Sequence, residues 1–341
     1  MKAKIQPRIN LDDRTALQDV IPLETPFILF VDPSSACNFR CTFCPTGDRD
    51  LIKGTGRFQG VMDFDLYRKI IDDLALFPQS IKVLRLYKDG EPLLNKRFAD
   101  MIAYAKNSGR VPYIDTTTNG SMITPERMGP LIEAGLDKIN ISAYGMTRAE
   151  YMDFTKYDFD LAKFVENVKW LYDHKRDCEI VIKIPGELIT EAERREFFDT
   201  FGDYCDRIFI ENFAPCWPDF DVETRLGVTI DTGIYQQPIS ITDTCPYIFY
   251  AMSINADGLA SACFVDWGRK LQVGDARLHS LPEIWNSREF NELRMIHLEG
   301  KRMQHPVCSK CGQLSHCRPD NIDQFRDELI PKMKMRIEGV A

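Results

Sequence analysis

The stretch that decides the fold is FILFVDPSSACNFRCTFC, residues 27–44, in which an apolar run is followed by three cysteines. Residues 27–31 predict a β-strand, so the loop with Cys37, Cys41 and Cys44 leaves the carboxyl end of that strand. In α/β folds this end carries the active site. Thiolates bind iron–sulfur clusters, Cu(I) or zinc, and three thiolates leave one metal of a four-iron cluster open to a small molecule. A zinc site or cysteines that only pack are the alternatives.

Composition and charge exclude several classes of protein. Of the 341 residues, 44% are apolar and 28% are charged, which is typical of a folded domain. The net charge of −8 argues against a nucleic-acid partner and against binding to an anionic membrane surface. The longest apolar runs are strand-length and residues 1–12 are polar, so we expect a cytoplasmic protein without a membrane span. The oligomeric state is left open.

Strand-like and helix-like segments alternate from residue 27 to residue 213. The expected strands cover residues 27–31, 81–86, 113–117, 138–142, 179–184 and 207–213. The expected helices lie near residues 65–77, 97–107, 124–134, 161–174 and 191–201. This alternation predicts an α/β fold with a parallel sheet, either doubly wound or an incomplete barrel.

A second group of cysteines lies in the last third of the chain. Its members are Cys245, Cys263, Cys308, Cys311 and Cys317. In a reducing compartment such clustering indicates metal binding or catalysis rather than disulfides, and the spacing suits zinc or a four-iron cluster. Around these cysteines we expect a hairpin of residues 252–255 and 259–263, a helix over 281–298 and a terminal helix over 324–337.

The first cysteine loop resembles that of the radical S-adenosylmethionine (SAM) superfamily, which has the same spacing and an aromatic residue, here Phe43, before the third cysteine. The resemblance implies a partial (β/α)6 barrel and a [4Fe-4S] cluster on Cys37, Cys41 and Cys44 that binds SAM. Such enzymes cleave SAM reductively to a 5′-deoxyadenosyl radical, which abstracts hydrogen from a substrate. A flavodoxin- or ferredoxin-type protein is then the expected electron donor.

Further residues match the motifs with which this superfamily holds SAM. DGEP at residues 89–92 resembles its Gly-Gly-Glu-Pro motif, with Asp89 in place of the first glycine. Polar residues at later strand ends resemble those that meet the ribose, and a lysine in the fifth strand is a candidate for the SAM carboxylate. The cofactor-binding residues that the resemblance implies are Phe43, Gly90, Glu91, Pro92, Thr116, Thr118, Asn119, Ser142 and Lys183.

The second cysteine group resembles the SPASM and twitch extensions of radical SAM enzymes, which bind auxiliary clusters. The spacings of 18, 45 and 3 are similar to those of twitch-type aminocyclitol (2-deoxy-scyllo-inosamine) dehydrogenases. This implies one auxiliary [4Fe-4S] cluster on Cys245, Cys263, Cys308 and Cys311, with Cys317 spare or an alternative ligand. The expected domains are a lead-in (1–25), a partial barrel (26–213), a linker (214–244), a SPASM/twitch domain (245–320) and a terminal helix (321–341).

These resemblances imply an oxidoreductase that oxidises or epimerises a small polar substrate such as a sugar, aminosugar or aminocyclitol. An auxiliary cluster can accept the electron that such an oxidation releases. Cys216 lies just past the sixth expected strand and is a candidate hydrogen donor, with packing as its other interpretation. Glu187, Glu211 and Tyr87 are the candidates for the general base, and the sequence does not choose between them. Radical modification of a peptide or protein is the alternative function, and a zinc-stabilised α/β binding protein is a remote one.

Overall fold

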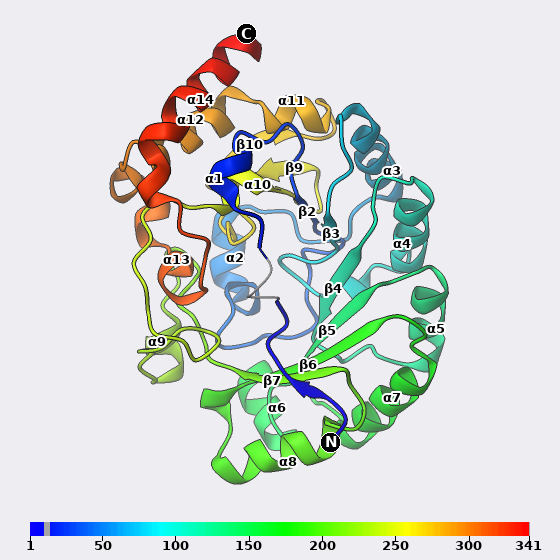
Figure 1. The fold of residues 1–341 in the computed structure, drawn as a ribbon. Coiled ribbons are helices and arrows are strands. Elements are labelled where there is room, and N and C mark those ends of the chain that lie inside the picture. The colour runs from blue at the N-terminus through cyan, green and yellow to red at the C-terminus, as the bar shows by residue number, and fades with distance from the viewer. Residues whose placement is uncertain (10–13, 341) are drawn as a thin grey trace.

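A computed structural model describes residues 1–9 and 14–340, and within them ten strands form one sheet (Figure 1). The strands are β1 (Lys4–Ile5), β2 (Ile28–Val31), β3 (Val83–Arg85), β4 (Ile114–Thr118), β5 (Lys138–Ser142), β6 (Glu179–Pro185), β7 (Arg207–Glu211), β8 (Ala251–Ile254), β9 (Leu259–Ser261) and β10 (Gln272–Asp275). Their order across the sheet is β1-β7-β6-β5-β4-β3-β2-β8-β9-β10. Strands β2 to β7 are parallel neighbours in chain order, which confirms the predicted α/β fold with its partial barrel.

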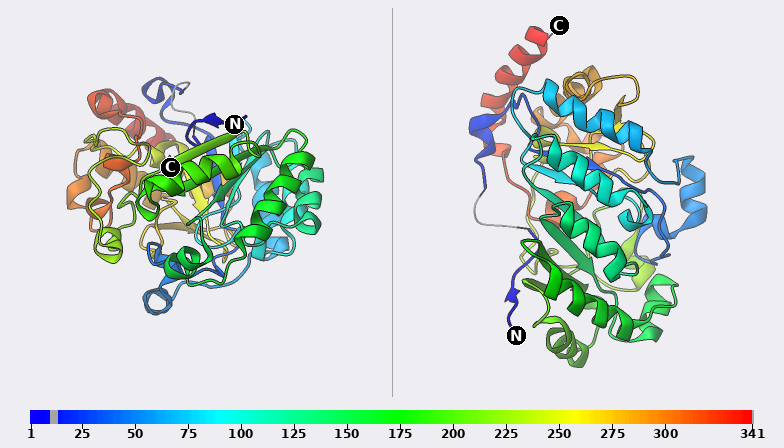
Figure 2. Two further views of the ribbon diagram at one scale, coloured as in Figure 1. Left: turned by 90° about the horizontal axis from the view of Figure 1, so that it is seen from below. Right: turned by 90° about the vertical axis from the view of Figure 1, so that its right-hand side faces the viewer.

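Helices connect the parallel strands and cover the outer side of the sheet, as Figures 1 and 2 show. The five expected helices are present as α3 (Phe64–Asp72), α4 (Phe98–Asn107), α5 (Pro125–Glu133), α7 (Leu161–His174) and α8 (Glu191–Phe201). Two further helices of the barrel, α2 (Arg49–Thr55) and α6 (Arg148–Thr155), were not predicted. The remaining α-helices are α1 (Leu17–Val20), α9 (Val222–Leu226), α10 (Tyr247–Tyr250), α11 (Leu281–Trp285), α12 (Arg288–Leu298), α13 (Gln313–His316) and α14 (Arg326–Val340).

The core lies between the sheet and these helices. Leu29, Leu84 and Ile114 are in register on β2, β3 and β4, and all three are fully buried. Burying one such side chain stabilises the fold by about 1.5–3 kcal/mol. Because the strands are parallel and in register, their carboxyl ends meet at one edge of the sheet, and the loops that leave this edge are brought together.

The hairpin that precedes Cys263 belongs to the same sheet. The predicted hairpin is present as β8 and β9, with Gly258 at a positive φ of 90° in its turn. Strand β8 also pairs in parallel with β2, from Ile28 opposite Ala251 to Val31 opposite Ile254. This pairing was not predicted, and it makes the hairpin a continuation of the barrel sheet.

Two expectations about the last third need correction. The single helix expected over residues 281–298 is two helices, α11 and α12, because Ser287 leaves the helix and its hydroxyl caps α12 by accepting from the Phe290 N–H. The terminal helix, expected over residues 324–337, begins at Arg326, ends at Val340 and contains Pro331. Within the described residues, no helix combines the length and the apolar character needed to cross a bilayer.

Candidate active site

The first cysteine loop is held from outside by helix α6. The Arg40 N–H donates to the Thr155 carbonyl at 2.8 Å, and the Thr42 N–H donates to the Phe154 carbonyl at 2.9 Å. These bonds satisfy backbone groups that would otherwise lie unpaired in a partly buried loop. The carboxyl end of α6 therefore fixes the path of the chain between the first and third cysteines.

Gly47, just after the third cysteine, packs closely against the backbone of the loop. A Cβ on Gly47 would lie 2.2 Å from the Cys41 carbonyl oxygen, so no larger residue fits without moving the backbone. Phe43, the aromatic residue of the motif, is buried and packs its ring against Tyr144 and Phe213, with centroids 5.4 Å and 4.9 Å away. The ring of Phe43 thus anchors the loop to the barrel wall.

Burial and mutual repulsion favour the neutral form of the three thiols. Burial, with Glu91 nearby, raises the pKa of Cys37 to about 12. Burial also raises the pKa of Cys41 and of Cys44, and the charges of Cys37 and Cys44 contribute at Cys41. The thiols therefore lie close enough to act on one another, and a cationic metal centre would stabilise them together as thiolates.

Glu91 joins the loop after β3 to the end of β4. Its Oε1 accepts from the Leu93 N–H at 3.0 Å and from the Thr118 hydroxyl at 2.7 Å, and its Oε2 accepts from the Asn119 N–H at 2.8 Å. The Glu91 N–H donates to the Ala36 carbonyl at 2.9 Å. Burial raises the pKa of Glu91 to about 7. Three predicted cofactor-binding residues, Glu91, Thr118 and Asn119, therefore meet beside the cysteine loop.

The turn that carries Glu91 packs directly on the cysteine loop. A Cβ on Gly90 would lie 2.1 Å from the Ala36 carbonyl oxygen, so the glycine admits the backbone of the loop itself. Pro92 begins a 3-10 turn directly after Glu91. The Asn119 amide lies 3.8 Å from the Cys37 sulfur. The motif after β3 and the strand-end asparagine therefore support the segment around Cys37.

The other predicted SAM contacts lie farther apart. The Thr116 hydroxyl is fully buried and donates to the Leu86 carbonyl of the neighbouring strand at 2.8 Å. Ser142 ends β5 and is buried at the same edge as Asn119. Lys183 pairs with Glu211 at 2.6 Å inside the barrel.

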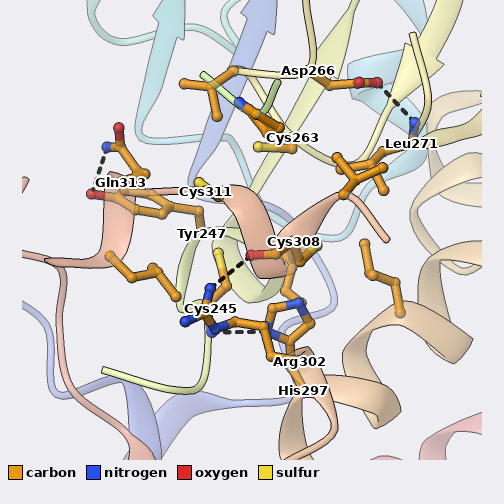
Figure 3. A pocket seen from close by; sticks show the side chains of 16 residues that line it. Cys245, Tyr247, Cys263, Asp266, Leu271, His297, Arg302, Cys308, Cys311 and Gln313 are labelled. Carbon is orange, nitrogen blue, oxygen red and sulfur yellow. Dashed lines mark hydrogen bonds between the residues drawn. The ribbon is translucent and has the colours of Figure 1, made fainter. Parts of the chain in front are cut away.

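Four cysteines of the second group surround one enclosed, mainly apolar cavity, and their sulfurs point into it (Figure 3). They are Cys245, Cys263, Cys308 and Cys311. The Cys245 N–H donates to His297 Nδ1 at 3.1 Å, and Arg302 Nη1 donates to the Cys308 carbonyl at 2.7 Å. Burial lowers the pKa of His297 to about 3, so this imidazole is neutral and its Nδ1 is free to accept.

The donor set fits an iron–sulfur cluster. The four thiols border one cavity, and four thiolates around such a space suit a cage of several irons. Cys317 lines a different cavity, so the structure separates it from the other four.

That second cavity, the central cavity, has a volume of about 450 Å³. Lys88, which pairs with Asp89, and Cys216 are among the residues that line it. Tyr247, Val265 and Gln313 line both the central cavity and the cavity of the four thiols. A space of substrate size therefore adjoins the site of the four thiols.

The candidate bases differ in their access to the central cavity. Tyr87 lines it, and its hydroxyl accepts from Arg85 Nη1 at 3.0 Å. Glu187 accepts from the Phe213 N–H at 2.9 Å and is not among the lining residues. Burial would raise the pKa of Glu211, but Lys183 and a neighbouring arginine hold it below its ordinary value.

A buried group of charges connects the two cysteine segments, and it was not predicted from the sequence. The Asp89 carboxylate lies 2.6 Å from Arg269, 3.1 Å from Lys88 and 3.8 Å from Arg57. The Thr46 hydroxyl, just after the first cysteine loop, donates to the Asp89 carbonyl at 2.7 Å. The only signal was the acid at a position where the superfamily motif has glycine.

Comparisons with known proteins agree with this geometry. The model of the radical SAM superfamily matches residues 31–201, and the model of the SPASM iron–sulfur cluster-binding domain matches residues 245–312. The chain is 24% identical over 326 residues to the tungsten-containing aldehyde ferredoxin oxidoreductase cofactor-modifying protein of Pyrococcus furiosus, covering 85% of this chain and 88% of the relative. It is 32% identical over 134 residues to a GTP 3′,8-cyclase of Corynebacterium glutamicum, covering 38% of this chain and 34% of the cyclase.

Solved structures share the fold at lower sequence identity. BtrN in complex with AdoMet and 2-DOIA superposes with a TM-score of 0.56 at 17% identity, covering 87% of this chain and 97% of BtrN. Streptococcus suis SuiB bound to precursor peptide SuiA gives a TM-score of 0.62 at 14% identity, covering 88% of this chain and 72% of SuiB. The chain therefore belongs to the radical SAM superfamily: it is a radical SAM enzyme with a C-terminal SPASM domain, and it uses SAM, the [4Fe-4S] cluster that binds SAM, and an auxiliary iron–sulfur cluster.

Proposed function

We propose that this enzyme abstracts a hydrogen atom from a sugar, aminosugar or aminocyclitol in the central cavity, and that it oxidises or epimerises this substrate. The observation that carries the proposal is the position of the cavity, which shares Tyr247, Val265 and Gln313 with the auxiliary cysteine site and is also lined by Cys216 and by Lys88, the neighbour of Asp89. When bound, SAM and its cluster supply the hydrogen abstraction, and the auxiliary cluster supplies an acceptor for the second electron.

Polar side chains of the cavity suit a hydroxylated substrate. The Tyr87 hydroxyl faces the cavity beside Arg85, where it can hold the hydroxyl of a substrate and pass on its proton. Apolar and aromatic residues such as Phe30, Phe264 and Trp217 line other parts of the wall and exclude water. The residues present can therefore orient an alcohol carbon and remove a proton during oxidation.

We assign SAM to the edge formed by Glu91, Thr118, Asn119 and Ser142, beside the first cysteine loop. The support is the contact of Glu91 with Thr118 and Asn119 and of Asn119 with Cys37, together with the position of Ser142 at the carboxyl end of the neighbouring strand β5. A flavodoxin- or ferredoxin-type donor completes the proposal as the source of the first electron.

Cys216 decides between the two outcomes. Its side chain lines the central cavity, and its carbonyl accepts from the Cys311 thiol at 3.5 Å. In an epimerisation, a thiol in this position returns a hydrogen atom to the substrate carbon, whereas a dehydrogenation does not need one. In D2O, deuterium at the substrate carbon that disappears in Cys216→Ala supports epimerisation, and oxidised product without deuterium supports dehydrogenation.

The relative from Pyrococcus furiosus, which matches over most of both chains, is named as a cofactor-modifying protein. That name supports a small-molecule substrate over a peptide. A substrate screen with both classes tests the choice: conversion of polyols or aminosugars supports the proposal, and conversion of peptides alone contradicts it.

Anaerobic reconstitution tests the radical chemistry itself. We expect about eight irons and matching sulfide per chain, as two four-iron clusters require. Reduction in the presence of SAM should then release 5′-deoxyadenosine, and Cys37→Ala should abolish this release. Zinc without sulfide would refute the proposal, and release by Cys37→Ala would refute the cluster assignment.

A further inference from the structure

We propose that the substrate carries an oxyanion, a phosphate or a carboxylate, which binds to arginine side chains of the central cavity. This inference rests on the proposed function only in taking the cavity as the substrate site. The basic side chains that line it are Arg8, Arg14, Lys82, Arg85 and Lys88. Among the described lining residues the only carboxylate is Asp320. A cavity of this charge is unexpected in a protein whose net charge is −8.

Some of these cations share a single buried carboxylate with other cations. Arg8 and Lys183 share one carboxylate, Glu211, at 3.3 Å and 2.6 Å. Lys88 shares Asp89 with two arginines, as described above. Arg14 pairs with Asp320 at 3.0 Å and Arg85 lies 3.7 Å from Asp115. Among the described residues, Arg8 and Lys88 are thus the lining cations that share their carboxylate with other cations, and an anionic ligand would offset their charge.

Arg8 and Arg85 are only partly covered by protein. Their side chains are 24% and 22% exposed, although Arg8 Nε lies 3.3 Å from Glu211 and Arg85 Nε lies 3.7 Å from Asp115. A guanidinium has five N–H donors in a planar fork that matches the oxygens of a phosphate or carboxylate. The exposed part of each side chain can accordingly take an oxyanion while Nε stays beside its carboxylate.

Lys82 and Arg85 lie at opposite ends of β3. Lys82 comes just before the strand, whereas Arg85 is its last residue and is followed by Tyr87 and Lys88, which also line the cavity. An oxyanion bound at Arg85 would therefore lie toward the carboxyl end of β3, near Lys88.

Three probes test the inference with reconstituted, SAM-loaded enzyme under anaerobic conditions: inorganic pyrophosphate, glucuronate and glucose, with affinities measured by calorimetry. We expect pyrophosphate or glucuronate to bind about tenfold or more tightly than glucose, and to weaken as salt is raised. If pyrophosphate binds more tightly, the oxyanion is a phosphate, and if glucuronate binds more tightly, it is a carboxylate. Equal binding of all three probes, or binding of none, would overturn the proposal.

Variants locate the site. Because Arg85→Gln alone leaves Asp115 buried opposite a neutral group, the test variant is Arg85→Gln with Asp115→Asn, which removes the pair together. The double variant should bind the anion about tenfold or more weakly than wild type, whereas Arg85→Lys should keep part of the wild-type affinity. Arg288→Gln, at an exposed ion pair, is the matched control and should bind like wild type. Wild-type anion affinity in the double variant would also overturn the proposal.

Release of 5′-deoxyadenosine by the wild-type enzyme is measured in parallel. If the wild type cleaves SAM but binds neither anion, the oxyanion inference fails and the proposed function stands. If it does not cleave SAM, the proposed function fails whatever the probes do.

Discussion

Asp89 and Arg269 form an ion pair of 2.6 Å between two buried side chains that belong to different cysteine segments. Asp89 precedes the Gly90–Glu91 turn beside the first loop, and Arg269 follows Cys263 of the second group. Each side chain is only 5% exposed, so water screens the pair weakly. The loops that bind the two clusters are therefore connected by a charge contact as well as by the sheet.

Replacing Asp89 tests this connection. Asp89→Gly restores the glycine of the superfamily motif but leaves Lys88, Arg57 and Arg269 without their shared carboxylate. We expect a loss of about 3–5 kcal/mol in the free energy of unfolding, as for other broken buried ion pairs. Denaturant unfolding measures it. Asp158→Asn breaks an exposed pair with Arg148 and should change stability by less than about 1 kcal/mol; an equal effect of the two changes would contradict the prediction.

The same region should make stability depend on pH. Burial, with repulsion from Asp89, raises the pKa of Asp32 from 3.8 to about 7. The folded protein thus retains the proton of Asp32 at pH values where the unfolded chain has lost it. The resulting stabilisation is complete below about pH 4 and is lost as the pH rises through about 7. Melting temperatures at pH 5.5 and pH 8 should show wild type losing stability relative to Asp32→Asn. Parallel curves for the two proteins would show that Asp32 does not titrate in this range.

Gly47 should be essential to the first cluster for steric reasons. In Gly47→Ala the new methyl group would lie 2.2 Å from the Cys41 carbonyl oxygen, so the loop must shift. We expect the variant to lose about half of its iron, from the cluster that binds SAM, and to release no 5′-deoxyadenosine. Gly54 lies nearby in α2, and a methyl group there meets nothing within 4 Å. Gly54→Ala should keep both clusters and gain up to about 1 kcal/mol in stability. Full iron content in Gly47→Ala would refute the steric argument.

The auxiliary cluster should depend on Cys311 and not on Cys317. Cys311 borders the cavity of the four thiols, whereas Cys317 lines the central cavity. Cys311→Ala should therefore lose about four irons per chain, and Cys317→Ala should lose none. Iron and sulfide counting, with electron paramagnetic resonance of the reduced proteins, distinguishes the two. A loss of iron in Cys317→Ala would show that the fifth cysteine is a ligand.

Local signals in the sequence were sufficient for strands β2 to β9, for most barrel helices and for both groups of cysteines, whereas β1 and β10 were not predicted. Periodicity and turn residues predicted α7 and α8 at their observed bounds, Leu161–His174 and Glu191–Phe201. Helix α6 was missed because its sequence, RAEYMDFT, has a weak apolar face, and packing of Tyr151 rather than amphipathic pattern holds it in place.

What the sequence could not predict depends on contacts between distant segments. Arg8 meets Glu211, and Arg269 meets Asp89, across separations that no motif encodes. The close packing of Gly90 on the backbone of the cysteine loop was also not visible in its motif. Charges in the central cavity likewise come from several elements, so their excess becomes visible only in the folded chain.

The parallel pairing of β8 with β2 limits how the enzyme can be divided. Strand β2 has β3 on one side and β8 on the other, so removing everything after the linker would uncover a row of unpaired backbone groups on β2, directly before the first cysteines. Exposed edges of this kind recruit other chains and aggregate. A barrel expressed without its SPASM domain should thus be an insoluble fragment rather than a simpler enzyme, and the two halves are best regarded as one folding unit.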